Sequence, residues 1–384
     1  MRALGMTGLL GLAHFADHYC LLIFPTAVLG LSQSWSLPYA EALALGSGAY
    51  IAFALATLPA GWLADRFGRV RVLRWFFPGL ALGLFLTGLA DTHLQLSLGL
   101  AVMGVAAALY HPVATALVVR ISEGSGKALA VNGLWGNLGV AAAAAVTGLL
   151  TAELGWRWAF LLPAAALLPC ALAFLVWAEE PSAEKAAARP RLPGKGTERL
   201  RAGRVLPLIA ISAACGGLVF NGVTFALPKL FELRLADLLP SLQWVGGASA
   251  AVFALAAFAQ LPVGLLLDRL GARLPLLLAT AAQVVFALAL AGTEGLATLP
   301  LAALLTLLVF GEIPITAWLM ARAVRPDWQS RAYAVQHLFS LGIAALTVPL
   351  IAGLYAATQG MDALFLVLGS AAAAVFLAGV LLLR

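Results

Sequence analysis

Twelve apolar runs, each long enough to cross a lipid bilayer as a helix, constrain the fold of this chain more than any other feature. A helix needs about 20 mostly apolar residues to span the hydrocarbon core. Charge clusters and Gly or Pro turns separate the runs, which lie at 8–30, 39–63, 72–90, 95–119, 128–150, 156–178, 205–232, 242–266, 274–292, 296–321, 331–357 and 361–383. Because lipid offers no hydrogen bonds, each backbone segment must pair with itself, as a helix does. The sequence therefore predicts an all-α polytopic membrane protein.

The composition excludes a soluble globular domain. Hydrophobic residues make up 62% of the 384 residues and charged residues only 10%, whereas a soluble surface is normally covered by Lys, Glu, Arg and Asp. The three cysteines, Cys20, Cys170 and Cys215, lie in apolar runs, so we expect buried small hydrophobes and not a disulfide framework. We expect a multi-pass protein of the cell (inner) membrane that carries no cofactor.

One long charged stretch divides the chain. It covers residues 179–204, and six apolar runs precede it and six follow it. Such a polar segment is typical of a flexible linker. We therefore expect an N-terminal six-helix bundle at 1–178, a cytoplasmic linker at 179–204 and a C-terminal six-helix bundle at 205–384.

The basic residues predict the orientation. With the N-terminus inside, 20 of the 23 Lys and Arg residues fall on the inner side, and Arg157, Lys229 and Arg234 fall toward the other. An excess of basic residues marks the cytoplasmic loops of membrane proteins. We therefore expect both termini in the cytoplasm. Basic side chains facing anionic headgroups also account for the net charge of +6 without a nucleic-acid partner.

The two halves repeat each other. The segment GWLADRFGRVR starts at Gly61, at the end of the second run of the first half, and GLLLDRLGAR starts at Gly264, 203 residues later, at the end of the second run of the second half. His18 also lies seven residues before Pro25, as Asn221 lies seven before Pro228. Two loop motifs in register indicate duplicated bundles.

These loops resemble the signature loop of the major facilitator superfamily and its weaker second copy. The resemblance implies two six-helix bundles that rock around a central site to give alternating access. It also implies a charge network in which Asp65 and Arg69 stabilise one conformation, with Glu123 as the partner of Arg69. The alternative is that these residues only set the topology. The full set of motif residues is Gly61, Asp65, Arg66, Gly68, Arg69, Glu123, Asp268 and Arg269.

A narrower resemblance is to the fosmidomycin-resistance branch of efflux proteins. It rests on His14 with Asp-His-Tyr at 17–19, Tyr-His-Pro at 110–112 and Gly-Asn-Leu-Gly at 136–139. Two features depart from related drug/proton antiporters: Leu100 stands where they commonly have an arginine, and alanines at 141–145 replace a Gly-Pro pair. The resemblance implies proton-coupled drug efflux.

Ionisable side chains within the apolar runs are candidates for function because they are costly in lipid. His14, Asp17 and His18 are spaced i, i+3, i+4, which places them on one helical face. Four of the five histidines lie within the runs, a concentration that packing alone does not explain. The candidate proton-coupling or substrate residues are His14, Asp17, His18, Tyr110, His111, Glu312 and His337.

Three interpretations of this set stay open. Asp17 with His14 or His18 could load and release a proton, because histidine titrates near neutral pH and burial shifts a carboxylate's ionisation. Imidazoles and a carboxylate also suit a divalent transition metal or its chelate. Finally, the groups could only hydrogen-bond between helices, at about 0.6 kcal/mol each.

Other polar and aromatic residues complete the expected cavity. Glu312 precedes Ile313 and Pro314, and we expect Pro314 to break its helix and free backbone carbonyls near the acid. No arginine lies at mid-membrane depth, which disfavours a small, strongly anionic substrate. The expected cavity-lining residues are Tyr19, Tyr50, Trp135, Asn137, Asn221, Trp318 and Gln336.

The sequence contains no GxxxxGK[ST] phosphate loop, no HExxH and no GxSxG, so neither ATP-driven transport nor hydrolase chemistry is expected. We expect a monomeric secondary transporter that moves a small organic molecule, coupled to protons or another ion. The alternatives are a transition-metal or metal-chelate transporter and a ligand sensor that resembles a transporter without transporting.

Overall fold

The structure is a computed structural model that describes residues 2–121, 126–179, 202–324 and 329–383. Within them, twelve helical spans are long and apolar enough to cross a membrane. Each predicted run corresponds to one span, and the observed ends lie within four residues of the expected ones. The predicted all-α fold with twelve spans is therefore confirmed.

Several spans are built from two shorter helices. The helices of the first half are α1 (Arg2–Leu21), α2 (Ile23–Ser34), α3 (Tyr39–Ala44), α4 (Ser47–Phe67), α5 (Arg69–Leu73), α6 (Phe76–Gly88), α7 (His93–Ala107), α8 (Tyr110–Ile121), α9 (Gly126–Leu154) and α10 (Trp158–Trp177). The interruptions between α1 and α2 and between α7 and α8 lie close to the candidate residues on α1 and α8.

The second half follows the same plan. Its helices are α12 (Ala202–Ile211), the π-helical turn η1 (Ser212–Gly216), α13 (Gly217–Arg234), α14 (Leu242–Ala257), α15 (Gln260–Leu270), α16 (Arg273–Ala291), the 3-10 turn η2 (Gly295–Ala297), α17 (Thr298–Ala323), α18 (Gln329–Gly342), α19 (Ala344–Thr358) and α20 (Asp362–Leu382). The expectation that Pro314 breaks its helix is wrong. Pro314 lies inside α17, which continues as one helix on both sides of it.

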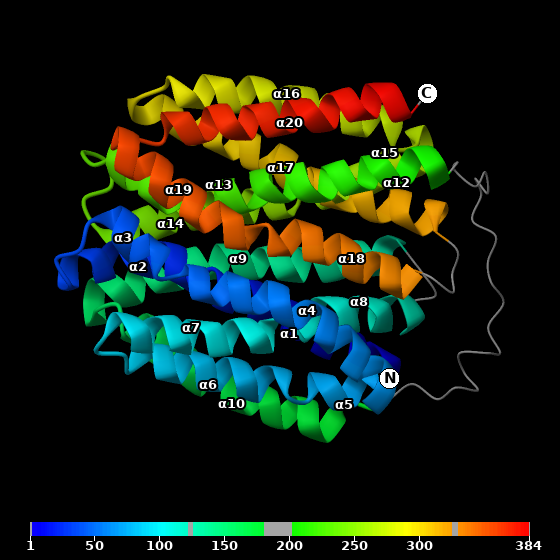
Figure 1. Cartoon of the computed structure of the whole chain (residues 1–384), viewed down its shortest axis with the longest axis horizontal. Coiled ribbons are helices and arrows are strands. Elements are labelled where there is room, and N and C mark those ends of the chain that lie inside the picture. Colours follow the sequence, from blue (N-terminus) through cyan, green and yellow to red (C-terminus); the bar gives the residue numbers. More distant parts are fainter. Residues whose placement is uncertain (1, 122–125, 180–201, 325–328, 384) are drawn as a thin grey trace.

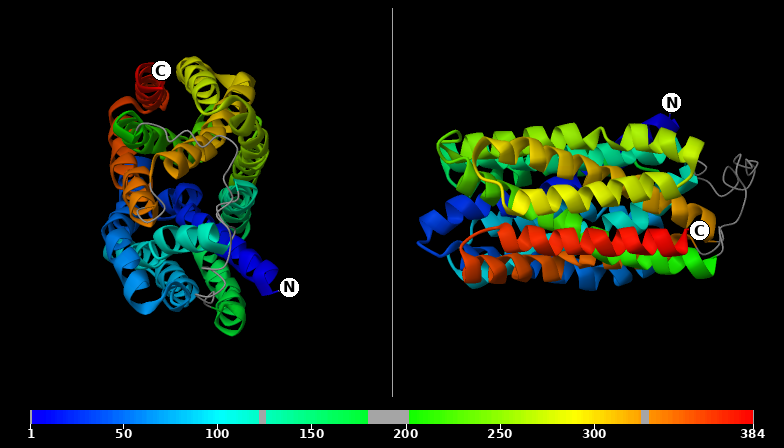
Figure 2. Two further views of the ribbon diagram at one scale, coloured as in Figure 1. Left: turned by 90° about the vertical axis from the view of Figure 1, so that its right-hand side faces the viewer. Right: turned by 90° about the horizontal axis from the view of Figure 1, so that it is seen from above.

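The spans run side by side along one direction. In Figure 1 the helices of the first half occupy the lower part and those of the second half the upper part, with α18, α19 and α9 near the boundary. The marked N- and C-termini lie at the same end, and the views of Figure 2 show the same grouping. Which side of the membrane the two termini face stays a prediction from the basic residues.

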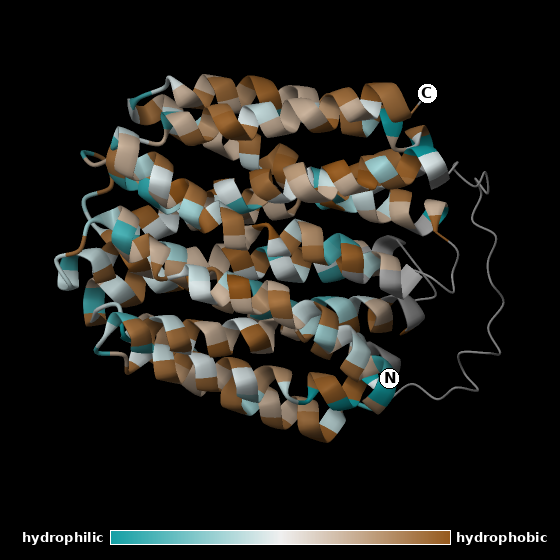
Figure 3. Cartoon of the chain, viewed as in Figure 1, coloured by the Kyte–Doolittle hydropathy of each residue, from teal (hydrophilic) through white to brown (hydrophobic). Residues whose placement is uncertain are grey.

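Polar residues gather at the two ends of the spans and apolar residues cover the lateral faces, as Figure 3 shows. Large apolar side chains such as Leu55, Leu172 and Trp177 are 73%, 63% and 68% exposed. An apolar lateral surface of this kind is stable only against lipid.

Glycines let the central helices approach closely. A methyl group at Gly139 of α9 would lie 2.2 Å from the carbonyl oxygen of Phe15 on α1. Between the two halves, Gly148 of α9 and Gly246 of α14 pack against each other, and a Cβ on either would lie 2.9 Å from the other's Cα. Small residues at such crossings allow backbone contact in membrane bundles.

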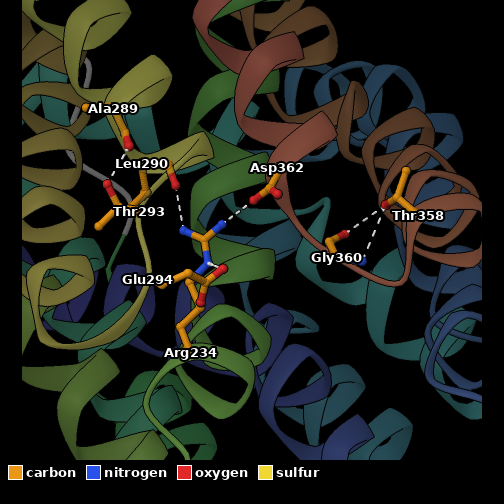
Figure 4. Close-up of polar contacts among 8 residues, drawn as sticks. All are labelled: Arg234, Ala289, Leu290, Thr293, Glu294, Thr358, Gly360 and Asp362. Atoms are coloured by element: carbon orange, nitrogen blue, oxygen red, sulfur yellow. Dashed lines mark hydrogen bonds and ion pairs between the residues drawn. The ribbon is translucent and has the colours of Figure 1, made fainter.

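Arginines tie helix ends together at the end opposite the termini. Arg234, at the end of α13, donates to the carbonyl oxygen of Leu290 at 2.5 Å, pairs with Asp362 at the start of α20 and lies 3.8 Å from Glu294 (Figure 4). The first half uses Arg157, which bonds the carbonyl oxygen of Ala90 at 2.5 Å. Each half thus joins the ends of its third and sixth spans through one guanidinium.

The two halves also meet at this end. The rings of Tyr39 on α3 and Tyr355 on α19 lie 5.0 Å apart, and the Lys229 ammonium lies 4.8 Å from the Tyr39 ring centre. Lys229 is held there by Glu232 at 2.5 Å. A desolvated ammonium over aromatic faces is attracted to them, so this contact favours closure of the halves at this end.

Candidate functional site

Polar side chains from α1 and α8 form one buried cluster. His14, Asp17 and His18 lie on the same face of α1, as their spacing predicted, and they face His111 of α8. The ring centres are 4.9 Å apart for His14 and His18, and 5.3 Å from each of them to His111. The structure thus brings together residues that are about 100 positions apart in the sequence.

Asp17 is the anionic group of the cluster. Its side chain is fully buried, and its Oδ2 lies 3.0 Å from Nε2 of His111. The two atoms are at ion-pair distance but are not aligned as a hydrogen bond, so both carboxylate oxygens and His111 Nε2 lack a hydrogen-bond partner within the described protein. Buried polar atoms without partners are rare and point to a ligand, a water or a proton that joins them.

The orientation of His14 is set by its neighbours on α9. Its Nδ1 lies 2.7 Å from the carbonyl oxygen of Asn132, and because a carbonyl only accepts, Nδ1 carries the proton. Nε2 is then an acceptor that has no hydrogen-bond partner among the described residues. Gly136 lies directly against it, since a Cβ there would be 2.6 Å from Nε2.

Tyr110 is a positioning residue of the cluster. Its hydroxyl donates to the carbonyl oxygen of Leu10 at 3.0 Å and accepts from Nδ2 of Asn132 at 3.2 Å. Its ring stacks on His14 with centres 4.9 Å apart. Sequence reasoning missed Asn132, although an amide side chain inside an apolar run is itself a signal.

The cluster reaches the second half through His337 of α18. The rings of His111 and His337 lie 5.1 Å apart, and Nε2 of His337 lacks a hydrogen-bond partner within the described protein. Tyr333, one turn earlier, stacks on His337 at 6.4 Å. Residues of both halves therefore share one polar site.

Three imidazoles are close enough to consider a metal ion. One ligand atom from each of His14, His18 and His111 lies within 4.8 Å of the others. Two nitrogens bound to one tetrahedral zinc are only about 3.4 Å apart, given Zn–N bonds of about 2.1 Å. The rings would have to move slightly inward to share an ion.

A small cavity adjoins the cluster at the boundary between the halves. His18 and Asn221, which occupy equivalent positions of the repeat, both line it. Tyr50 also lines it, with its hydroxyl donating to the carbonyl oxygen of Leu21 at 2.7 Å. The complete lining is His18, Leu21, Leu22, Tyr50, Phe53, Phe220, Asn221, Phe225, Leu341 and Ala344.

Glu312 lies apart from this cluster among its own partners in the second half. Its Oε2 accepts from Nε2 of Gln283 on α16 at 2.9 Å. On its other side is the π-helical turn η1, where a Cβ at Gly216 would lie 3.1 Å from Oε1. A π-turn is often found at functional sites. Glu312 therefore belongs to a second buried polar group.

The remaining residues expected to line a cavity are dispersed. Tyr19 stacks on Phe15 at 6.0 Å, and Trp135 packs over Gly11. Asn137 is buried. The Arg322 guanidinium carbon lies 3.6 Å from the ring centre of Trp318. Gln336 lines a separate apolar groove between α12, α17 and α18. Of the seven, Tyr50 and Asn221 line the cavity beside the histidines.

The two signature loops form tight turns. Gly68 and Gly271 each follow the helix that carries the motif, with φ of 94° and 72°, which glycine adopts without strain. Arg69 lies 3.8 Å from Asp65, and Arg66 stacks over Trp62. Gly61 approaches Pro112 of α8, and Arg269 is exposed. Glu123 and the side chain of Asp268 lie outside the described residues, so the partner expected for Arg69 stays a prediction.

Comparison with known proteins agrees with this architecture. Residues 7–340 match the profile of the Major Facilitator Superfamily. The xylose transporter XylE from E. coli, in a partially occluded inward-open conformation, superposes with a TM-score of 0.75 over 98% of both chains at 13% identity. That likeness concerns the fold alone.

Two curated relatives share shorter segments. The Multidrug resistance protein B homolog of Mycobacterium tuberculosis is 33% identical over 134 residues, which is 34% of this chain and 24% of the relative. The Probable 4-methylmuconolactone transporter of Cupriavidus pinatubonensis is 30% identical over 161 residues, 40% of this chain and 38% of the relative. The chain thus spans well under half the length of the relatives it matches. With twelve spans, the duplicated signature loop and a family match over most of its length, this chain is a multi-pass membrane protein that belongs to the Major Facilitator Superfamily.

Proposed function

We propose that this protein exports a small organic molecule in exchange for protons, and that the cluster around Asp17 carries the coupling. The observation that supports it is the contact of Asp17 with His111, 3.0 Å apart and without an aligned hydrogen bond. A carboxylate and an imidazole at this distance can share a single added proton. Such a site can be loaded from one side of the membrane and emptied to the other.

The position of the cluster connects the proton to the movement of the halves. His111 touches His337 of the second half, and His18 borders the cavity between the halves. A proton on Asp17 removes the charge that holds His111, so His111 is free to change its contact with His337. Protonation would then bias the equilibrium between two arrangements of the halves, which is what coupling requires.

Two resemblances support export. The motifs on α1, α8 and α9 are similar to those of fosmidomycin-resistance efflux proteins, and one curated relative is named a multidrug resistance protein. The loop motif with Asp65 and Arg69 would stabilise one of the two conformations from the end that carries the termini.

The test uses purified full-length protein in liposomes that contain the pH dye pyranine. An anionic, a cationic and a neutral probe are added in turn: 4-methylmuconolactone, ethidium and methyl 4-hydroxybenzoate. We expect at least one probe to drive proton movement through the native protein. Asp17→Asn should abolish that movement, whereas Asp237→Asn, an exposed carboxylate outside the spans, should leave it intact. Equal proton movement in Asp17→Asn, or none in the native protein with all three probes, contradicts the proposal. Counterflow of a labelled probe separates transport from ligand sensing.

A second candidate function is transport of a transition metal or its chelate. It rests on the three imidazole ligand atoms within 4.8 Å of one another. The protein would then bind Co²⁺ with the visible absorption bands of a low-symmetry nitrogen site, and a His14→Ala/His18→Ala double variant would lose them. Absence of such bands in the native protein leaves the organic substrate as the cargo.

A further inference from the structure

The apolar groove between α12, α17 and α18 lies toward the end of the spans where the termini are (Figure 1). Its volume is about 640 Å³, within the range of roughly 300–1,000 Å³ that is usual for sites of small ligands. Among the described residues that line it, all but Gln336 are apolar. The groove therefore has the size and the chemistry to hold an apolar molecule or an apolar part of one.

The groove opens on the lateral surface of the bundle. Its floor is formed by Ile209 of α12 and Met320 of α17, which are each 3% exposed. Leu206 of α12 and Phe339 of α18 stand at its two rims and are 43% and 51% exposed. Because the lateral surface of the spans is in contact with lipid, the molecules that reach this groove first are those of the bilayer.

The groove has its origin in a difference between the two halves. In the first half, α1 and α9 stay in contact, and Trp135 of α9 packs over Gly11 of α1. In the second half, the equivalent helices meet at Gly217 of α13, where a Cβ would lie 2.5 Å from the carbonyl oxygen of Ser340 on α18. From this contact toward the termini, the groove separates α12 from α18. The repeat is thus broken at this end of the second half.

Basic residues border the groove where its helices reach the membrane surface. Arg204 is exposed in the first turn of α12, two residues before Leu206 of the lining. Arg322 is in the last turn of α17, between Met320 and Ala323 of the lining. Basic side chains at this depth attract the headgroups of anionic lipids. The groove therefore combines an apolar path into the bilayer core with positive charge at its mouth.

We propose that this groove binds one acyl chain of an anionic phospholipid from the leaflet on the side of the termini, with the phosphate of that lipid near Arg204. The apolar lining takes the chain, and the arginine selects the charge of the headgroup. The site is independent of the transported molecule and of the coupling ion. Because α18 also carries His337, which contacts His111, the bound chain supports a helix that links the two halves.

The test is native mass spectrometry and thermal-shift titration of the full chain in detergent. The probes are dioleoylphosphatidylglycerol, which is anionic, dioleoylphosphatidylcholine, which has the same chains and a zwitterionic headgroup, and glycerol phosphate, which has no chains. We expect the first phosphatidylglycerol to bind at least about 5-fold more tightly than phosphatidylcholine, because an arginine near the surface favours an anionic lipid by roughly this factor. It should also raise the melting temperature, whereas glycerol phosphate should not bind.

Two pairs of variants place the lipid in the groove. Ala210→Phe fills the lining from α12 and should weaken binding of phosphatidylglycerol at least about 10-fold, since each methylene kept out of an apolar site weakens binding severalfold. Ala165→Phe, the same change at an exposed site of α10, should leave it unchanged. Arg204→Gln should weaken binding of phosphatidylglycerol about 5-fold and leave that of phosphatidylcholine unchanged. Arg71→Gln, at another exposed arginine near the same end, is its control.

Several results would overturn the inference. They are no binding of phosphatidylglycerol, equal affinity for the two lipids, binding of glycerol phosphate as tight as that of the lipid, and unchanged binding in Ala210→Phe or Arg204→Gln. Equal losses in Ala165→Phe or Arg71→Gln would do the same, because they would show a lipid spread over the whole surface. Arg204→Gln changes only an exposed side chain, so it keeps the test decisive if Ala210→Phe fails to fold.

Discussion

The imidazoles of His111 and His337 lie in contact across the boundary between the two halves of the molecule, with ring centres 5.1 Å apart. His111 also lies 3.0 Å from Asp17 within the first half. The same ring therefore takes part in the buried carboxylate site and in the contact between the two halves. His111 thus links the buried carboxylate directly to the second half, as a coupling between charge and movement of the bundles would require.

The first prediction concerns His337. His337→Phe keeps a ring of similar size but removes the nitrogens, so the fold should lose less than about 1.5 kcal/mol of stability. If the contact couples protons to movement, proton flux in liposomes should fall at least 10-fold. Val335→Ala, two residues away on an exposed face of the same helix, is the control. Unchanged flux in His337→Phe would mean that the contact is packing alone.

The second prediction separates a structural from a functional role of Glu312. Glu312→Gln keeps an acceptor for Gln283, so stability should change little, whereas Glu312→Leu leaves the buried Gln283 amide without its partner and should cost about 1–3 kcal/mol. If Glu312 handles protons, both variants lose gradient-driven transport. Transport that survives in Glu312→Gln assigns the carboxylate to structure. Unfolding curves and liposome flux measured on the same preparations decide the matter.

The third prediction tests the close packing of α1 against α9. Gly139→Ala forces a methyl group against the carbonyl oxygen of Phe15 and should destabilise the protein by about 1–3 kcal/mol. Gly247→Ala, on α14 with nothing within 4 Å of the added carbon, should be neutral or stabilise by up to about 1 kcal/mol. Thermal unfolding in detergent compares the two. Equal melting temperatures would show that α1 and α9 do not pack this closely.

The fourth prediction concerns the guanidinium of Arg234 (Figure 4). Its side chain is 5% exposed and joins α13 to the carbonyl oxygen of Leu290 and to Asp362. Arg234→Gln should lower stability by about 1–3 kcal/mol because the carbonyl oxygen of the buried Leu290 loses a charged donor. Arg71→Gln, an exposed arginine at the other end, should change it by less than about 0.5 kcal/mol. Denaturant unfolding of both variants provides the comparison. Similar midpoints would show that the contacts of Arg234 do not stabilise the fold.

The fifth prediction concerns the signature loop. The pair of Asp65 and Arg69 is 3.8 Å long and Asp65 is 67% exposed, so its contribution to stability should be below about 1 kcal/mol. Asp65→Asn should therefore leave the melting temperature nearly unchanged while reducing transport, if the loop favours one conformation. Asp237→Asn, an exposed carboxylate outside the spans, serves as the matched control. Full transport in Asp65→Asn would assign the loop to topology only.

Much of the fold could be predicted from the sequence because its causes are local. The length of each apolar run determines whether it can span lipid, and the twelve expected spans were confirmed. Helical periodicity alone placed His14, Asp17 and His18 on one face. The repeat offset of 203 residues also linked His18 to Asn221, and the structure places both on one cavity.

The sequence by itself determined that lipid surrounds the protein, how many spans it has, that its two halves repeat and which face of α1 carries the polar groups. Each of these depends on residues near one another along the chain. Only the tertiary structure decided which faces meet. It brought His111 and His337 to Asp17, turned Glu312 toward Gln283 instead, and let α17 continue through Pro314. The reason is physical: helix pairing depends on the fit of whole surfaces, such as Gly139 against Phe15, and that fit is not written in the spacing of any single helix.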